Sequence, residues 1–339
     1  MKVKKVTGFG YIYLLSSRDL IHATMPFTTE NRLTSWFCFL STFFMIIASY
    51  AGTILFSSLY LKFSSGIFAA MVMTRMFVIY HDFQHEAIFR RSWVMKVFMT
   101  FFGMLALAPV SIWDESHEHH HHNNSKFSTF VVGSFPVIST TTFGNLSSAG
   151  RLKYLLIRHP LMIVFSYIPI FLVSFCLWPF FENARRYWDC GVAAFVHITL
   201  AVILTVVGGF QLLFFTLIIP CLLMYALGGY IFYAQHNFPK VVLKENEDWD
   251  YLDAALSSSS YIKMNRLMRW FTANIGYHHI HHVNPRIPFY RLPEVMKAFP
   301  ELQSPRETSL HPREILHCLR LKLWDIEKGR MVTLRELRA

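Results

Sequence analysis

Long apolar runs separated by short polar segments dominate the chain. Four windows are apolar and nearly free of charge, and they cover about 33–60, 66–88, 160–181 and 191–233. An uncharged helix of about 18 or more residues can cross a hydrocarbon core of roughly 30 Å, because a helix rises about 1.5 Å per residue. The pattern therefore predicts an all-α integral membrane protein with about four transmembrane helices.

Two apolar segments do not fit a simple straight span. The run from Gly191 to Tyr233 is about 43 residues long, and breaks are expected at Gly208-Gly209 and at Pro220. The shorter segment between Trp93 and Trp113 carries a lysine and ends in a proline, which favours an interfacial or re-entrant helix that does not cross.

Composition and charge support a membrane protein. Apolar residues make up 53% of the chain and charged residues only 16%, which is unlike a soluble domain. The net charge of +11 is concentrated before the first window, in 90–158 and after His236. By the positive-inside rule these regions face the cytoplasm, in a bacterial inner membrane or the endoplasmic reticulum. The basic charge then reports topology and contact with membrane lipids, and no nucleic-acid partner is expected. Five scattered cysteines without a CxxC pair exclude a disulfide-stapled scaffold and a zinc ribbon.

Histidines are clustered in a pattern that predicts metal binding. Twelve of the 17 lie in 81–85, 117–122 and 278–282 or at His236. On a helix, residues at i, i+3 and i+4 share one face, so each of the three runs presents several imidazoles together. Neutral imidazole is a good ligand for iron, zinc or copper. His119, His122 and His279 lie off the shared faces and are interpreted as outer or incidental.

The three runs read HDFQH, HEHHH and HHIHH, and the chain resembles a membrane fatty-acid desaturase of the three-histidine-box type. The flanking sequences WDESH and NIGYHHIHHVNPRIPFYRLPE strengthen the resemblance, which covers about residues 35 to 300, and YAQHNF supplies the additional histidine usual in that family. The crowded second run departs from the pattern, and the frame that starts at His117 is preferred. The resemblance implies four spans, interfacial helices and a cytosolic histidine-rich cap that holds a non-haem di-iron centre. The implied iron ligands are His81, His85, His117, His120, His121, His236, His278, His281 and His282.

The resemblance also implies a reaction and its partners. We expect O2-dependent desaturation of a fatty acyl chain that is linked to a lipid or a thioester. No reductase or haem-attachment motif is present, so a separate electron donor, a ferredoxin or a b-type cytochrome, is expected. Lys263, Arg266 and Arg269 recur three apart and form a candidate docking stripe, with headgroup binding as an equal alternative. No catalytic residue beyond the metal ligands is predicted.

Other functions use similar residues. Membrane hydroxylases and ketolases carry the same boxes, so desaturation is not distinguished from hydroxylation. A metal transporter would place ligands near the middle of broken helices, whereas these runs lie at the ends of the apolar windows. HEHHH formally satisfies the HExxH zinc-protease pattern, but a protease would leave the other two boxes unexplained.

The chain divides into a cytosolic N-terminal segment (1–34), the desaturase domain (35–300) and a cytosolic C-terminal tail (301–339). If a single centre gathers all the histidines, the number of membrane crossings between His121 and His236 must be even. One crossing by 160–181 and one by 191–233 would meet this condition.

Overall fold

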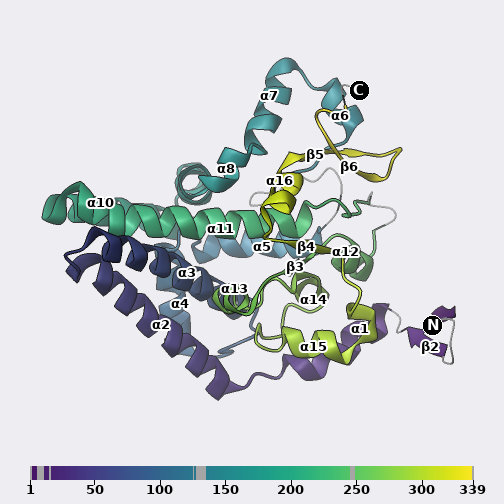
Figure 1. Cartoon of the computed structure of the whole chain (residues 1–339), viewed down its shortest axis with the longest axis horizontal. Helices are drawn as coiled ribbons and strands as arrows, with labels where there is room; N and C mark the ends of the chain where they lie inside the picture. The colour runs from purple at the N-terminus through teal and green to yellow at the C-terminus, as the bar shows by residue number, and fades with distance from the viewer. Residues whose placement is uncertain are drawn as a thin grey trace.

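The apolar windows form the long helices of the computed structural model, which describes residues 2–5, 11–14, 17–124, 126, 135–244 and 249–337. The long helices extend to one side of the molecule, and the short elements gather at the other (Figure 1). The long helices are α2 (Arg32–Leu55), α3 (Leu59–Gln84), α10 (Trp188–Leu213) and α11 (Ile219–His236). They leave many large apolar side chains exposed, such as Phe195 and Val206 on α10, as a helix surrounded by lipid does.

In the described part of the chain, three helical stretches are long and apolar enough to cross a membrane: Arg32–Leu55, Leu59–Gln84 and the continuous stretch Trp188–His236. A fourth is obtained when α4 (Trp93–Leu105) and α5 (Val110–His122) are counted as one bent pair, with 87° between them. The prediction of a mostly helical membrane protein is confirmed. A sharp bend after α4 is also what a re-entrant segment requires, as expected for this part of the chain.

The stretch Trp188–His236 is not straight, because the chain folds back at Gly209. Gly209 has φ 65° and ψ −168°, far from helical values. Tyr167 contacts residues that precede and follow Gly209 in the sequence. The Tyr167 hydroxyl lies 2.5 Å from His197 Nε2, and the Tyr167 ring stacks on Tyr225 with 5.4 Å between centroids. His197 and Tyr225 would be about 42 Å apart along a straight helix. The helices α10 and α11 therefore run in opposite directions.

The window 160–181 begins and ends near the histidines. At its start, Arg158 donates to Asn237, the residue after His236. Beyond its end, Arg186 and Tyr187 donate to Glu115, two residues before His117. The window itself is broken into α8 (Pro160–Val164), the π-helical stretch η2 (Tyr167–Leu177) and α9 (Trp178–Glu182).

This path differs from the expected one, in which 160–181 and 191–233 each cross once. The structure turns both ends of 160–181 to the histidine end and folds 191–233 into two antiparallel helices. The chain still returns to the histidine end before His236, as one centre requires, although different segments bring it back. Hydropathy reports how apolar a segment is, not the direction in which its ends point, so the sequence alone did not distinguish the two paths.

Short elements build the cap around the histidines. Its helical elements are α1 (Ser17–Thr24), η1 (Met25–Thr28), α6 (Thr140–Asn145), α7 (Ser148–Ile157), α12 (Tyr251–Ser257), α13 (Arg266–Phe271), α14 (His278–Val283), α15 (Leu292–Ala298), η5 (Pro300–Leu302) and α16 (Pro312–Arg320). Its strand pairs are β1 (Lys2–Lys5) with β2 (Tyr11–Leu14), antiparallel, β3 (Tyr261–Lys263) with β4 (Glu307–Ser309), parallel, and β5 (Leu321–Asp325) with β6 (Arg330–Thr333), antiparallel.

The C-terminal segment packs on the rest of the chain. The fully buried Arg158 side chain donates to the Leu321 carbonyl, to two carbonyls of 135–136 and to the Tyr233 hydroxyl. Leu323 and Val332 of the β5–β6 hairpin form a small apolar cluster with Tyr154 of α7. The C-terminal segment is thus held against the end of α11, next to His236.

Candidate metal centre

The nine histidines predicted as metal ligands lie together in two adjacent groups. His81 and His85 come from the end of α3, His236 ends α11, and the others come from α5 and α14. Within each group the ring nitrogens lie within 4.8 Å of one another. The first group is His81, His85, His117, His121 and His281, and the second is His120, His236, His278 and His282.

The ring nitrogens are spaced like ligands of a common ion. In the first group, His117 Nε2 lies 2.9 Å from His85 Nε2 and 3.1 Å from His121 Nε2. In the second group, His278 Nε2 lies 2.8 Å from His236 Nε2 and 3.0 Å from His282 Nε2. Metal–nitrogen bonds of about 2.0–2.1 Å place neighbouring ligand atoms about 3 Å apart. A cation at each position therefore fits this spacing.

Two helices contribute to both groups. From α5, His117 and His121 enter the first group, whereas His120 enters the second. From α14, His281 enters the first group, whereas His278 and His282 enter the second. Residues at i and i+4 share a helix face, and i+3 lies slightly to one side of it, so one helix can serve two neighbouring ions. The rings of His121 and His282 stack at 4.4 Å between centroids across the boundary.

The imidazoles are buried and available to a cation. Burial, followed by the neighbouring imidazoles of His236 and His120, holds the pKa of His278 well below its usual range. Burial, followed by the imidazoles of His121 and His278, holds the pKa of His282 well below its usual range, so both rings are neutral at pH 7. The buried His120 Nε2 has no hydrogen-bond partner among the residues that the structure describes. A buried nitrogen without a donor or acceptor is costly unless it binds something, and a metal ion satisfies it.

Contacts outside the two groups orient some of the rings. Asp82 Oδ1 lies 3.2 Å from His81 Nδ1, and Asp82 Oδ2 accepts the backbone N–H of Phe289 at 2.6 Å. His236 Nδ1 lies 3.0 Å from the Ser258 carbonyl oxygen. Such contacts determine which ring nitrogen carries the proton, and here they leave Nε2 free for a metal. Asp82 directly follows His81 in the sequence and is recognisable there as a possible partner, whereas a backbone carbonyl such as that of Ser258 gives no signal.

The remaining histidines of the runs lie outside both groups. His119 and His122 are exposed on the outer side of α5. Glu118 is exposed on that side as well, 3.8 Å from His122. It does not face the metal ligands, as the glutamate base of an HExxH protease must. His279 is buried, and its Nε2 lies 3.3 Å from the Leu302 carbonyl oxygen.

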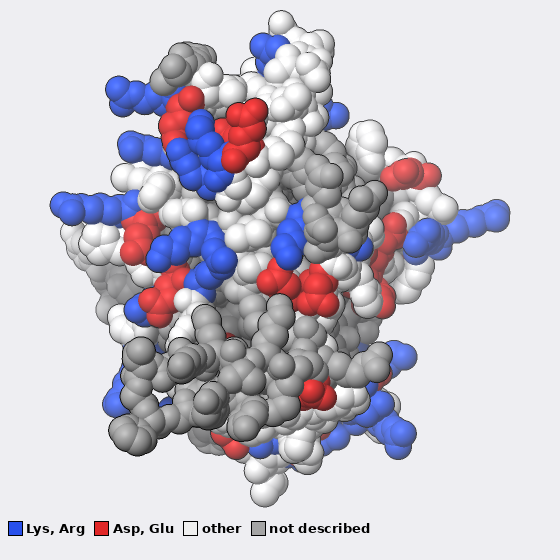
Figure 2. Space-filling model, turned by 90° about the vertical axis from the view of Figure 1, so that its right-hand side faces the viewer, with Lys and Arg blue, Asp and Glu red and all other residues white. Residues whose placement is uncertain are grey.

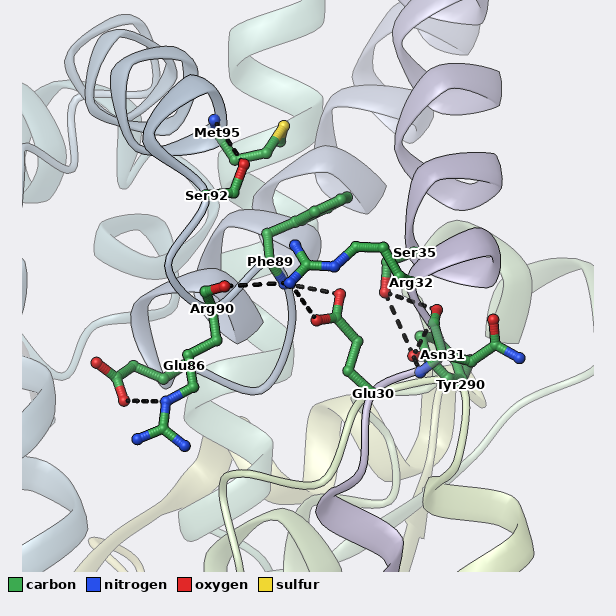
Figure 3. A network of polar contacts seen from close by, with 10 residues as sticks. All are labelled: Glu30, Asn31, Arg32, Ser35, Glu86, Phe89, Arg90, Ser92, Met95 and Tyr290. Carbon is green, nitrogen blue, oxygen red and sulfur yellow. Dashed lines mark hydrogen bonds and ion pairs between the residues drawn. The ribbon is translucent and has the colours of Figure 1, made fainter.

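A network of hydrogen bonds and an ion pair holds the loop that follows the first histidine box, residues 81–85 (Figure 3). Glu30 Oε1 accepts the backbone N–H of Phe89 at 2.8 Å, and its other oxygen lies 3.2 Å from Arg32. Arg32 also donates to the Arg90 carbonyl at 3.1 Å. Phe89 has φ 55°, an uncommon conformation for a bulky residue, so the loop depends on contacts such as this one. The network joins the start of α2 to the chain just beyond His85.

Comparison with known proteins agrees with the geometry. A model of the family described as "Fatty acid desaturase" matches residues 57–313. The chain belongs to the fatty acid desaturase family. It is also 26% identical, over 273 residues, to a protein of Bacillus subtilis (strain 168) named "Fatty acid desaturase". That alignment covers 80% of this chain and 77% of the relative. The matched region contains all three boxes and His236, so the desaturase family resemblance drawn from the sequence is confirmed.

Proposed function

We propose that this desaturase family member introduces a double bond into a fatty acyl chain, linked to a lipid or a thioester, at a centre of two iron ions. The observation that carries the proposal is the division of nine histidines, seven buried and two partly buried, into two groups with metal-ligand spacing. The ligand set holds neither a thiolate nor a carboxylate, and imidazole suits iron. When bound, the two irons with O2 and two electrons supply the strong oxidant that removal of hydrogen from an unactivated methylene requires.

The protein's own part is to hold the ions and exclude water. Asp82 and the Ser258 carbonyl orient their imidazoles. Trp113 stacks on His117 with 4.5 Å between ring centroids, and Phe232 covers His120 at 5.1 Å. These apolar rings close the sides of the ligand groups, and a dry site protects a reactive centre from side reactions.

We further propose that α2, α3, α10 and α11 cross the membrane and that the histidine end faces the cytoplasm. This proposal is supported by the fold-back at Gly209 and by the contacts of Arg158 and Arg186 near the histidines. Lys62 is then the main cation on the opposite side, in keeping with the positive-inside rule. Reporter fusions after Arg158, after Arg185 and after Lys240 should all give the cytoplasmic signal.

A separate electron donor remains part of the proposal, but the docking stripe loses support. Lys263 lies in β3 and pairs with Glu307 at 2.6 Å, while Arg269 donates to the Tyr277 hydroxyl at 3.2 Å. Arg266 and Arg269 alone lie on α13. Figure 2 shows lysine and arginine interspersed with acidic side chains on the cap, not gathered in one basic patch.

The test is expression in a host that lacks the activity, with mass spectrometry of total lipids and metal analysis of the purified protein. We expect a product two mass units lighter than its precursor, formed only with O2, and near two irons per chain. A product sixteen units heavier would make the protein a hydroxylase. One zinc per chain and no lipid change would overturn the proposal.

A further inference from the structure

We propose that Asp189 is a positioning residue for the metal centre, acting through the helix that carries the second histidine box. The proposal rests on the proposed metal-dependent function. Asp189 lies on α10, is 5% exposed and is far in sequence from every histidine box. Its carboxylate reaches the first turn of α5, about ten residues before the ligands His120 and His121.

The N-terminus of α5 has no cap of its own. Pro109 occupies the N-cap position and makes no side-chain hydrogen bond there. Asp189 Oδ2 instead accepts the Ser111 backbone N–H at 3.0 Å, and Oδ1 accepts the Ser111 hydroxyl at 2.5 Å. Ser111 is the second residue of α5. The backbone N–H at this position is normally satisfied by the side chain of the N-cap residue, which directly precedes the helix. Here an oxygen from a distant helix takes that place.

The carboxylate of Asp189 also accepts a hydrogen bond within its own helix, α10. Asp189 is in the first turn of α10, and its Oδ1 accepts the Cys190 backbone N–H at 3.1 Å. Two helix N-termini therefore converge on one buried negative charge, and each carries a partial positive charge that stabilises it. The arrangement fixes the start of α5 relative to α10.

A second contact lies one turn further along α5. Glu115 Oε2 accepts from Arg186 at 2.8 Å and from the Tyr187 hydroxyl at 2.6 Å. The Arg186–Glu115 pair is largely exposed, with 62% and 49% of the two side chains accessible, so it contributes little to stability. Residues 186–189 thus contact α5 at Ser111 and at Glu115. The buried contact, between Asp189 and Ser111, is the stronger of the two. Glu115 provides a matched control on the same helix.

Because α5 supplies ligands to both groups, a shift of its N-terminal turn disturbs both metals. Asp189→Ala removes all three hydrogen bonds, whereas Asp189→Asn keeps the shape but loses the charge and one acceptor. Loss of an outer partner of a metal ligand set costs roughly 10–100-fold in metal affinity. We expect roughly tenfold weaker binding at both positions in Asp189→Ala, a smaller loss in Asp189→Asn and little change in Glu115→Gln.

The experiment uses the full chain in lipid nanodiscs, stripped of metal and titrated with Co²⁺, whose visible absorption bands report ligand geometry. Asp189→Ala should weaken both binding steps and change the bands. Val332→Ala, in the C-terminal hairpin, is the control for lost stability and should leave the bands as in wild type. If Asp189→Ala does not fold, Asp189→Asn and Ser111→Ala carry the test, and wild-type bands and affinity in both would overturn the proposal.

Hydrogen–deuterium exchange of residues 110–114 adds a readout that needs no metal. Faster exchange in Asp189→Asn together with altered Co²⁺ binding supports the positioning role. Faster exchange with wild-type Co²⁺ binding at both sites leaves Asp189 as a cap alone and overturns that role. A wild-type protein that binds no Co²⁺ overturns the proposed metal centre instead, so the two failures are distinguishable.

Discussion

Glu30 offers a quantitative test of how the first histidine box is held. Glu30→Ala removes the oxygen that accepts the Phe89 N–H at 2.8 Å. Phe89 is fully buried, so neither water nor a local turn readily replaces the lost acceptor. The variant therefore leaves a buried donor unsatisfied in the loop that directly follows His85.

The size of the effect follows from the two contacts of Glu30. A hydrogen bond to a charged group contributes about 1.5–3 kcal/mol, and the partly exposed pair with Arg32 adds about 0–1 kcal/mol. A loss of about 2 kcal/mol raises the equilibrium constant for local opening roughly 30-fold. Glu30→Gln keeps a neutral acceptor and should lose less than half of this free energy.

The assay is hydrogen–deuterium exchange with mass spectrometry on peptides that cover 85–92. Glu86→Ala is the matched control, because it breaks the Glu86–Arg90 pair in the same loop, where both side chains are 57% exposed. That variant should exchange nearly as wild type does. If Glu30→Ala also exchanges at the wild-type rate, the loop does not depend on the network of Figure 3, and the reasoning is refuted.

Three further predictions concern other parts of the chain. Burial and the nearby Arg158 lower the pKa of Lys322 to about 8, below its unfolded value, so the unfolded chain binds more protons between these values. Stability should rise as pH increases from about 8 to 10.5, by at most about 3 kcal/mol, and thermal unfolding of Lys322→Met should lack this rise. Gly209→Ala meets no atom at the new Cβ but forces alanine into a backbone conformation that essentially only glycine adopts, so unfolding in detergent should show a loss of about 1–3 kcal/mol, and an unchanged midpoint would count against strain there. His120→Ala should lose metal from the second group while His122→Ala retains it, and equal metal contents would contradict the assignment.

The sequence predicted which histidines lie together better than it predicted the path of the chain. Spacing of i, i+3 and i+4 is a local property, so His117, His120 and His121 could be selected, and His119 set aside, before any fold was known. Their division between two groups could not be predicted, because it depends on how α5 and α14 lie against each other. The fold-back at Gly209 was expected as a break, but its direction depends on tertiary contacts such as those of Tyr167.

Residues that act from a distance left no signal in the sequence. Asp189 follows an apolar window and looks like an ordinary first-turn acid of its own helix. Arg158 looks like a flanking cation of the kind that marks a membrane interface, yet its side chain is fully buried and donates to carbonyls of two distant segments, 135–136 and β5. Nothing in the spacing of residues shows which distant backbone groups lack a partner.

Because the chain folds back at Gly209, the two ends of the protein differ: the cap lies at one end and short turns lie at the other. The short turn between α2 and α3 lies at the same end as the turn at Gly209, because Thr53 bonds Thr216 at 3.0 Å across the two helix pairs. Among the described residues, both helix pairs close there in tight bends that offer no platform for a soluble molecule. Under the proposed function and membrane orientation, an electron carrier, a soluble thioester and any regulatory protein would share the single cap surface and compete for it. A lipid-linked chain alone would reach the centre without crossing that surface, by lateral diffusion within the bilayer.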